Sequence, residues 1–473
     1  MDYAKVGFKC GLEIHGQLDV GKLFCECPAV LRKDKPDFNV CRKLRAMAGE
    51  TGQIDVAAAH AQAKGLSYIY EGYNSSTCLV ELDEEPPHTI NQQALDAALT
   101  IATLLHCEIP NYVQVMRKTV VDGSNTSGFQ RTALVGLNGE LETPSGKVTI
   151  MSISIEEDAA RRTAEDKVSV TYRLDRLGIP LIEIVTGPDI KTPEQAKEVA
   201  LSIGRLLRAT GKAMRGIGTI RQDVNVSIKG HQRVELKGFQ DLKSMPGIIK
   251  GEINRQSDIL YKKEKPESHV RNVKQDGTTK FLRPMSGAAR MYPETDTPLI
   301  EITQKNLANI KKDLPEVPEK KLERLMAAGL NDDLANQVLF DKKFSVLHKK
   351  FPKLDPKLIA TTLISTQKEA RKKAGQERGE FTLEHFEYIF KLLIKCDIAK
   401  EAILDILVLV ATGEKIENAA NNFKLMSDAE LKKEFDKLKK EFSKVPAEKL
   451  KGVMIGRLRG KADIQKILKL LNQ

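Results

Sequence analysis

The spacing of apolar residues changes character near residue 302, and this change limits the fold more than any other feature of the chain. After it, strand-like patterns stop and Lys/Glu-rich amphipathic segments with helical spacing follow one another. Before it, short segments alternate apolar and polar residues or are rich in β-branched ones, as in 149–158, 167–175, 179–185 and 223–230. A β-rich region followed by an all-helical one predicts an α+β fold.

The length of the chain predicts several domains, because 473 residues exceed what one hydrophobic core usually holds. Segment 371–381 is charged, contains two glycines and is typical of a linker. We therefore predict a β-rich cradle domain over 1–302, a helical domain over 303–380 and a C-terminal helical tail domain over 381–473.

Capping residues mark the start of several predicted helices. Asn91 can cap a helix with an apolar face, and Thr192 and Gln195 have the spacing of a capping box. Ser427 and Glu430 have the same spacing in the helical region. These signals predict helices that begin directly after Asn91, Thr192 and Ser427.

The chain is basic, with 75 Lys and Arg against 64 Asp and Glu and a net charge of +11. This balance fits a polyanionic partner, and it equally fits a lysine-rich solvated surface. Aromatic residues are almost absent near the C-terminus, so the basic residues there favour phosphate contacts over base stacking. These residues are Lys444, Lys449, Lys451, Arg457, Arg459, Lys461, Lys466 and Lys469.

Several features of the sequence predict a cytoplasmic protein that does not associate with a membrane. No apolar run is long enough to span a bilayer, and the N-terminal segment MDYAKVGFKC lacks the pattern of a secretory signal. Seven cysteines are sparse for this length and fit a reducing compartment better than a disulfide framework.

Acidic residues inside predicted strands are the most informative chemical feature. The segment CGLEIHGQL (10–18) puts Glu13 and His15 on one face of a strand, since side chains two residues apart share a face. Glu183 lies within IPLIEIV, and Glu156 and Glu157 end SISIEED. Carboxylates in such runs are costly to bury unless they meet a cation. Each one alone is as well explained by a nearby arginine.

Taken together, these residues suggest a metal site. If their strands are neighbours, Glu13, His15, Glu157 and Glu183 could converge, and oxygen ligands with one nitrogen suit Mg²⁺ or Mn²⁺. Mg²⁺ with nucleotide phosphates would then imply phosphoryl transfer. Basic residues are available for the phosphates: Arg117, Lys118, Arg131, Arg221, Lys237 and Arg290.

The cysteines suggest a competing metal site. Cys25, Cys27 and Cys41 would give three of the four ligands that structural zinc usually takes, but the next suitable position is Leu44. We therefore expect packed thiols and no zinc. The loop DGSNTSG (122–128) could bind phosphate or present an amidase serine, but no Ser-Lys arrangement supports a nucleophile, and a polar turn is the plainer interpretation.

Several longer motifs follow one another in the first 302 residues: GLEIHGQL, KLFCECP, TCLVELDEEPPH, DGSNTSGFQRTALV, SIEEDAAR, YRLDRLGIPLIEIVTGPDI, GTIRQDVNVSI and GAARMYPETD. Together they resemble the B/E-type subunit of glutamyl-tRNA(Gln) amidotransferase, and the residues within them are more similar to those of the archaeal E form. The resemblance is strong over 6–302, and the helical remainder is similar mainly in layout.

The resemblance implies a catalytic domain with a glutamine-synthetase-like fold over 1–302 and the use of ATP and Mg²⁺. Such subunits phosphorylate the γ-carboxylate of glutamate on tRNA(Gln), and ammonia then displaces phosphate to give glutaminyl-tRNA. The implied partners are tRNA(Gln) charged with glutamate and an ammonia-producing amidase, either of the asparaginase-like D type or of the A plus C type. In this family the helical domain and the basic tail hold the tRNA.

The resemblance also places metal-binding motifs on Glu13 and His15, on 156–158 and on Glu183. Strand register decides which of Glu156 and Glu157 faces the ion, and spacing to Glu183 favours Glu157. Glu13, His15, Glu157 and Glu183 are thus the expected catalytic residues, with Glu156 kept as a candidate ligand. Segments that line the nucleotide or the tRNA 3′ end in the family fall on Arg221, Asp223, Asn225, Glu235 and Lys237.

Two departures from the family pattern stand out. E-type subunits usually carry an inserted aspartyl-tRNA-synthetase-like domain after the segment matching 235–242, and no globular domain fits there. In this chain, the segment that matches the zinc knuckle of B-type subunits lacks the fourth cysteine. The alternative to an enzyme is a non-catalytic tRNA-binding or assembly protein that has kept the cradle fold, and retention of the acidic residues argues against it.

Overall fold

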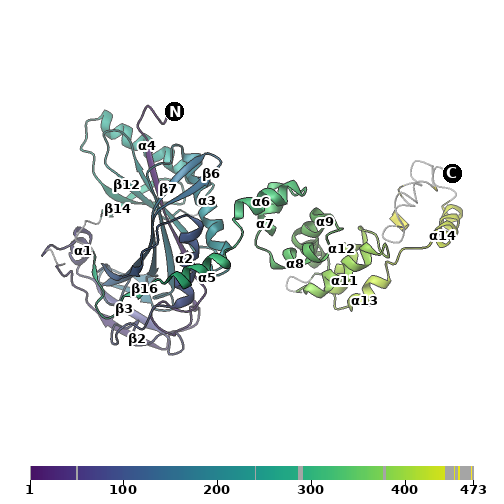
Figure 1. Cartoon of the computed structure of the whole chain (residues 1–473), viewed down its shortest axis with the longest axis horizontal. Helices are drawn as coiled ribbons and strands as arrows, with labels where there is room; N and C mark the ends of the chain where they lie inside the picture. The colour runs from purple at the N-terminus through teal and green to yellow at the C-terminus, as the bar shows by residue number, and fades with distance from the viewer. Residues whose placement is uncertain are drawn as a thin grey trace. The chain divides into compact units, whose positions relative to one another are not determined.

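The structure, a computed structural model, describes residues 2–48, 52–239, 241–285, 291–375 and 380–442, and residues 452, 456–458 and 470 beyond them (Figure 1). The chain divides into two compact units, Met1–Pro318 and Glu319–Gln473. The described residues combine sheets and helices, which confirms the α+β class. No helix among them is both long enough and apolar enough to cross a membrane.

The first unit is built on a ten-stranded sheet. Its neighbouring strands run antiparallel, apart from the parallel pair β12 and β13. The strand order is β14 (Thr279–Pro284), β13 (His269–Val273), β12 (Val234–Lys237), β11 (Ile220–Ser227), β1 (Lys9–Gln17), β10 (Pro180–Thr186), β7 (Gly146–Glu157), β6 (Phe129–Thr143), β5 (Val115–Thr119) and β15 (Met291–Pro293).

Two smaller sheets and five helices complete this unit in the residues described. The four-stranded sheet has the order β2 (Phe38–Arg42), β3 (Ser67–Gly72), β9 (Ser169–Arg173) and β8 (Arg161–Glu165), and β16 (Ile300–Glu301) pairs with β4 (Tyr112–Val113). The helices are α1 (Val56–Gln62), α2 (Gln92–Leu104), α3 (Pro193–Ala209), α4 (Met245–Tyr261) and α5 (Gln304–Lys312).

The large sheet has one apolar and one polar face. Along β1, Leu12 and Ile14 are buried in a core to which α2, α3 and α4 contribute, while Glu13 and His15 leave the opposite face. Burying one such Leu or Ile side chain stabilises the fold by about 1.5–3 kcal/mol. A slip of one residue would bury the two polar side chains instead, so the core fixes the register on which the polar face depends.

The second unit contains helices as its regular elements in the residues described, as predicted for the region after 302. They are α6 (Pro318–Ala327), which begins at the unit boundary, α7 (Asp332–Val338), α8 (Lys342–Lys350), α9 (Pro356–Thr361), a π-helical turn η2 (Thr362–Thr366), α10 (Gln367–Lys373), α11 (Leu383–Ile394), α12 (Ala402–Ala411), α13 (Ile416–Asn421) and α14 (Asp428–Glu441).

Residues on both sides of position 380 share one core in this unit. Phe351 and Phe390 pack with their ring centroids 5.9 Å apart, and the core extends from Leu322 to Ala420. A separate small cluster forms around Leu431 on α14. Residues 376–379 of the expected linker lie outside the described part, and the boundaries at 302 and 380 stay predictions.

The predicted helix starts are confirmed, with one difference in detail. Asn91 caps α2, Thr192 caps α3, and Ser427 begins α14 with a complete capping box. At α3, however, the Gln195 side chain accepts a hydrogen bond from the backbone N–H of Lys191 at 2.8 Å. The cap of Thr192 is therefore not reciprocated by Gln195 in the way a capping box requires.

Candidate functional site

A pocket of about 680 Å³ on the polar face of the large sheet is the candidate functional site. Neighbouring strands supply its wall, and residues two apart on each strand point into it together. The strand residues that line it are Glu13 and His15 of β1, Lys118 of β5, Gln130 of β6, Glu156 of β7, Leu181 and Glu183 of β10, Arg221, Gln222 and Asp223 of β11, Glu235 and Lys237 of β12, Arg283 of β14 and Met291 of β15.

Antiparallel pairing brings these distant segments into register. His15 lies directly opposite Glu183 of β10, and Glu13 lies opposite Asp223 of β11. Glu235 of β12 in turn lies opposite Asn225 of β11. The backbone ladder therefore determines which acidic side chains meet.

The first acidic group consists of His15, Glu156 and Glu183, whose ligand atoms all lie within 4.8 Å of one another. His15 Nε2 is 3.1 Å from Glu183 Oε1, and the Lys118 ammonium donates to Glu156. Burial alone would raise the pKa of Glu183, but Lys118 and His15 outweigh it and hold that pKa far below its usual value. Burial opposes the charged form of His15, and the nearby carboxylates outweigh this effect and raise its pKa.

The second acidic group consists of Glu13, Asp223 and Glu235, which meet the same 4.8 Å limit. Lys237 Nζ donates to Asp223 and lies 2.6 Å from Glu235 Oε1. Burial and the charge of Glu235 raise the pKa of Glu13. Burial alone would lower the pKa of Lys237, but the surrounding carboxylates outweigh burial and raise it.

Both groups have the chemistry of a hard divalent cation site. Carboxylate oxygens, with one imidazole in the first group, are ligands that suit Mg²⁺ or Mn²⁺. Three such side chains within 4.8 Å repel one another unless positive charge is present, and here Lys118 and Lys237 supply it. The donor sets therefore fit bound Mg²⁺, with one set on each side of the β1 strand.

Arg221 is the clearest candidate for a phosphate contact in this pocket. Its Nη2 donates to Asp158 Oδ1 at 3.0 Å, while its buried Nε has no hydrogen-bond partner within the described residues. A guanidinium with an unused donor is well suited to a phosphate oxygen. Arg233 and Arg283 add further positive charge to the pocket wall.

Glu157, which sequence spacing favoured as a ligand, does not join either group. It leaves the opposite face of β7 from Glu156, and its carboxylate accepts from the Arg131 backbone N–H at 3.2 Å and guanidinium at 3.4 Å. Burial raises its pKa, and Arg131 partly opposes this shift. A single-residue step along a strand reverses the face, so Glu156 takes the place expected of Glu157.

The structure also separates the predicted phosphate-binding residues into three sets. Lys118, Arg221, Asp223 and Lys237 line the pocket. Arg117 and Arg131 do not line it, because both guanidinium groups pair with the buried Glu294, at 2.6 and 2.9 Å. Arg290 lies outside the described residues, and so do the basic C-terminal residues apart from Arg457.

One ligand was missed in the sequence although the two-residue spacing that linked Glu13 with His15 could have indicated it. Glu235 was noted within a motif but not as a ligand, although it stands two residues before Lys237 on β12. Asp158 stands two residues after Glu156, and it also lines the pocket. Asp158 had already been included in the 156–158 motif by the resemblance, and applying the same-face rule to the acidic residues of β12 would have found Glu235 as well.

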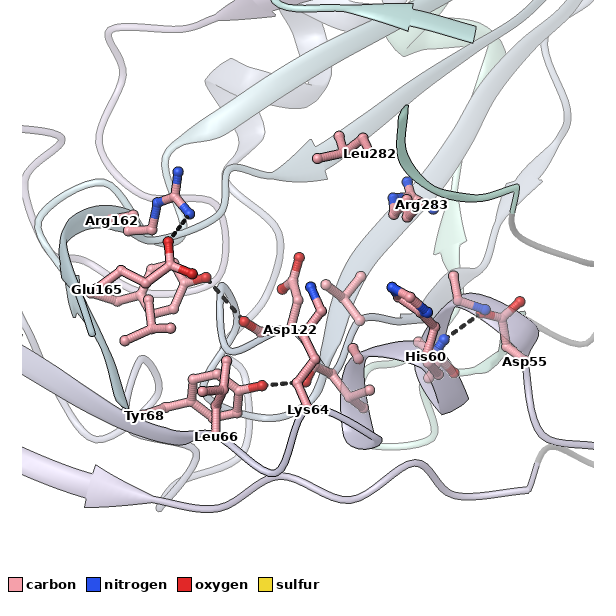
Figure 2. A pocket seen from close by; sticks show the side chains of 18 residues that line it. Asp55, His60, Lys64, Leu66, Tyr68, Asp122, Arg162, Glu165, Leu282 and Arg283 are labelled. Carbon is pink, nitrogen blue, oxygen red and sulfur yellow. Dashed lines mark hydrogen bonds and ion pairs between the residues drawn. The ribbon is translucent and has the colours of Figure 1, made fainter. Parts of the chain in front are cut away.

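A second cavity of about 240 Å³ lies between α1 and the four-stranded sheet (Figure 2). Most polar groups drawn in Figure 2 serve the local fold: Asp55 caps α1, Tyr68 donates to the Val121 carbonyl, and Arg162 pairs with Glu165. No group of metal-ligating side chains within the described residues converges on it. The acidic pocket is therefore the better candidate for chemistry.

Comparison with known proteins places this pocket in a family context. Residues 8–308 match the family described as the GatB/GatE catalytic domain. The chain is similar to the E-type subunit of glutamyl-tRNA(Gln) amidotransferase from Methanocaldococcus jannaschii, with 36% identity over 614 aligned positions that cover 98% of the chain and 97% of that protein. The corresponding protein of Sulfurisphaera tokodaii is 34% identical over 625 positions, which cover 100% and 99%. Both alignments exceed 473 positions, so these relatives carry stretches that this chain lacks.

Proposed function

The chain belongs to the GatB/GatE catalytic-domain family, and we propose that it is the subunit that phosphorylates and then amidates the glutamate carried by tRNA(Gln). Membership of the family makes it a tRNA-dependent amidotransferase subunit of the ligase class. The observation that supports the finer proposal is the acidic pocket, in which two sets of Mg²⁺-type ligands face a group of lysine and arginine side chains.

The chemistry explains why an amidotransferase needs such a pocket. A carboxylate is a poor acyl donor because its oxygen leaves badly. In the proposed first step, one γ-carboxylate oxygen of glutamate bonds to the γ-phosphorus of ATP while the bond from that phosphorus to ADP breaks. Ammonia then attacks the activated carbonyl carbon and loses a proton, and phosphate leaves with the former carboxylate oxygen. The products are glutaminyl-tRNA, ADP and phosphate.

The described residues divide this work between ligands and cations. His15, Glu156 and Glu183 would hold one Mg²⁺, and Glu13, Asp223 and Glu235 would hold another. Bound Mg²⁺ supplies stabilisation of the charge on the transferring phosphoryl group. Arg221 orients a phosphate oxygen through its unused Nε donor, while Lys118 and Lys237 offset the charge of the carboxylates.

An ammonia supply from a partner amidase, of the D type or the A plus C type, fits the composition of the pocket. No serine, threonine or cysteine is among the described residues that line it, so these residues offer no hydroxyl or thiol nucleophile to hydrolyse an amide. The basic C-terminal stretch gives the chain an electrostatic means to bind tRNA phosphates.

The experiment combines the purified chain with Glu-tRNA(Gln), ATP, Mg²⁺ and ammonium chloride and measures Gln-tRNA(Gln). We expect product with the wild-type chain, and loss of ATP turnover without loss of tRNA binding in Glu183→Gln. Glu140→Gln is the matched control, because Glu140 is also on a strand but its side chain is 45% exposed and paired with Lys147. Unchanged turnover in Glu183→Gln would favour the non-catalytic tRNA-binding alternative.

A further inference from the structure

Asp158 is a buried carboxylate of the acidic pocket that belongs to neither of its two acidic groups. It stands directly after β7 and two residues after Glu156, so the two side chains leave the same face of the chain. The resemblance placed the whole segment 156–158 in a metal-binding motif. A carboxylate of that segment that lies apart from both groups of ligands needs a separate explanation.

Hydrogen bonds from three segments hold Asp158 in one orientation. Its backbone N–H donates to the Ile179 carbonyl at 2.8 Å, and its carbonyl accepts from the Gly178 N–H at 3.0 Å. In the side chain, Oδ2 accepts from Gln17 Nε2 at 2.5 Å, and Oδ1 accepts from the Ala159 N–H at 2.9 Å. The carboxylate would lose these bonds if it turned toward a metal ion.

Asp158 also lies between two arginines. Arg221 Nη2 donates to Oδ1 at 3.0 Å, and Arg176 Nε lies 3.7 Å from Oδ2. Arg176 donates to the backbone carbonyls of Ala159 and Ala160 and does not line the pocket. Burial lowers the pKa of Arg176, Asp158 opposes this shift, and the charge of Arg221 adds to it. The carboxylate therefore offsets the repulsion between an arginine bound to the backbone and one that faces the pocket.

We propose that Asp158 is a positioning residue that holds Arg221 for the phosphates of the nucleotide, and that it is not a metal ligand. The inference rests on the proposed function, in which ATP binds in this pocket. A guanidinium is planar, so a bond at Nη2 fixes the direction of its remaining donors. One of these donors is the buried Nε of Arg221, which has no hydrogen-bond partner in the part of the chain that the structure describes.

The strand register places these donors where a phosphate on the first ion would need them. Arg221 of β11 lies directly opposite His15 of β1, and both side chains line the pocket. The Arg221 side chain is 41% exposed, so without an anchor it would sample several rotamers, and nucleotide binding would have to restrict them. Asp158 restricts them in advance.

The first test measures ATP binding to the full chain with Mg²⁺ by isothermal titration calorimetry, well below the melting temperature. We expect Asp158→Asn to weaken ATP binding about tenfold and Arg221→Ala to weaken it about 10- to 100-fold. Asp175→Asn is the matched control, because Asp175 is also fully buried and accepts from an arginine, Arg161, at 2.6 Å, but neither lines the pocket. It should lower the melting temperature and leave ATP affinity unchanged.

Two further measurements separate positioning from metal binding and from a purely structural role. Mn²⁺ affinity without nucleotide, measured by electron paramagnetic resonance, should stay within about twofold of wild type in Asp158→Asn. The double variant of Asp158→Asn and Arg221→Ala should bind ATP within about twofold of Arg221→Ala alone, because Asp158 acts through Arg221. A tenfold loss of Mn²⁺ affinity, or additive losses of ATP affinity, would overturn the proposal.

A milder variant keeps the proposal falsifiable if Asp158→Asn does not fold. Gln17→Met keeps an unbranched side chain and removes one donor to Asp158, and we expect ATP binding about threefold weaker, with no such loss when Arg221 is alanine. An equal loss in both backgrounds would overturn the proposal. A wild-type chain that binds no ATP would overturn the proposed function as well, whereas ATP affinity that Asp158→Asn leaves unchanged would overturn this inference alone.

Discussion

Replacing Glu156 by glutamine should lower activity, whereas replacing the adjacent Glu157 by glutamine should lower stability. Glu156 faces the acidic pocket and belongs to the group with His15 and Glu183, whereas Glu157 faces away and binds Arg131. Glu156→Gln should lower ATP-dependent Gln-tRNA formation by roughly 100- to 1000-fold, the usual cost of removing one charge-stabilising group from an active site. Its stability should change by less than about 1 kcal/mol, because relief of carboxylate repulsion offsets the lost contact with Lys118.

Glu157→Gln should reduce stability and leave activity within about threefold of wild type. It removes charge-assisted contacts to Arg131 at 3.2 and 3.4 Å, which contribute about 1.5–3 kcal/mol. The full cost of about 3–5 kcal/mol for breaking a buried pair is not expected, because Arg131 keeps its 2.9 Å bond to Glu294.

The assay pairs thermal unfolding of the full chain with turnover measured well below the melting temperature. Glu157→Gln should melt on the order of 5 °C lower than wild type, and Glu156→Gln should melt close to it. If Glu157→Gln were inactive and Glu156→Gln active, the assignment of faces along β7 would be refuted.

Three further perturbations follow from the structure. The raised pKa of His15 keeps its imidazole protonated to a higher pH than usual, and a protonated imidazole does not bind a metal ion. Apparent Mg²⁺ affinity should therefore fall about tenfold for each pH unit below that pKa. Mg²⁺ titrations of turnover at several pH values should show this slope, and a slope that persists in His15→Gln would contradict the prediction. Asn91→Ala should destabilise the chain by about 1–2 kcal/mol in thermal unfolding, because Asn91 caps α2 and also donates to the Val20 carbonyl; an unchanged melting temperature would argue against the cap. Gly16→Ala should lower the free energy of unfolding by about 1–3 kcal/mol, because the added carbon would lie 2.8 Å from the buried Leu207 side chain. Gly247→Ala in α4 is the control: its added carbon meets nothing within 4 Å, so it should be neutral or stabilising in the same assay.

Local patterns in the sequence were sufficient for the elements and for part of the site. Alternation along 10–18 placed Glu13 and His15 on one strand face, and the structure shows both there. Capping residues likewise predicted where α2 and α3 begin. Such predictions succeed because the determining contacts lie within a few residues of each other.

The side chains that the structure places outside the pocket are positioned by contacts between distant segments. The choice between Glu156 and Glu157 required the register of β7 against β10, which neighbouring residues do not encode. Arg117 and Arg131 were expected at the phosphates, but Glu294, far along the chain, occupies both.

The central proposal is that the acidic pocket transfers a phosphoryl group from ATP to the glutamate of Glu-tRNA(Gln). An oxygen label tests this most directly. Glutamate labelled with ¹⁸O in its γ-carboxylate is esterified to tRNA(Gln), and the full chain is supplied with unlabelled ATP, Mg²⁺ and ammonium chloride. Mass spectrometry of the released phosphate then reports whether a carboxylate oxygen has been transferred.

The proposal predicts one labelled oxygen in each phosphate released together with Gln-tRNA, because the carboxylate oxygen leaves bonded to phosphorus. The label should disappear with the product in Glu183→Gln. Release of unlabelled phosphate alongside Gln-tRNA would contradict the acyl-phosphate route, and the absence of Gln-tRNA with cognate tRNA would contradict the assignment of the pocket itself.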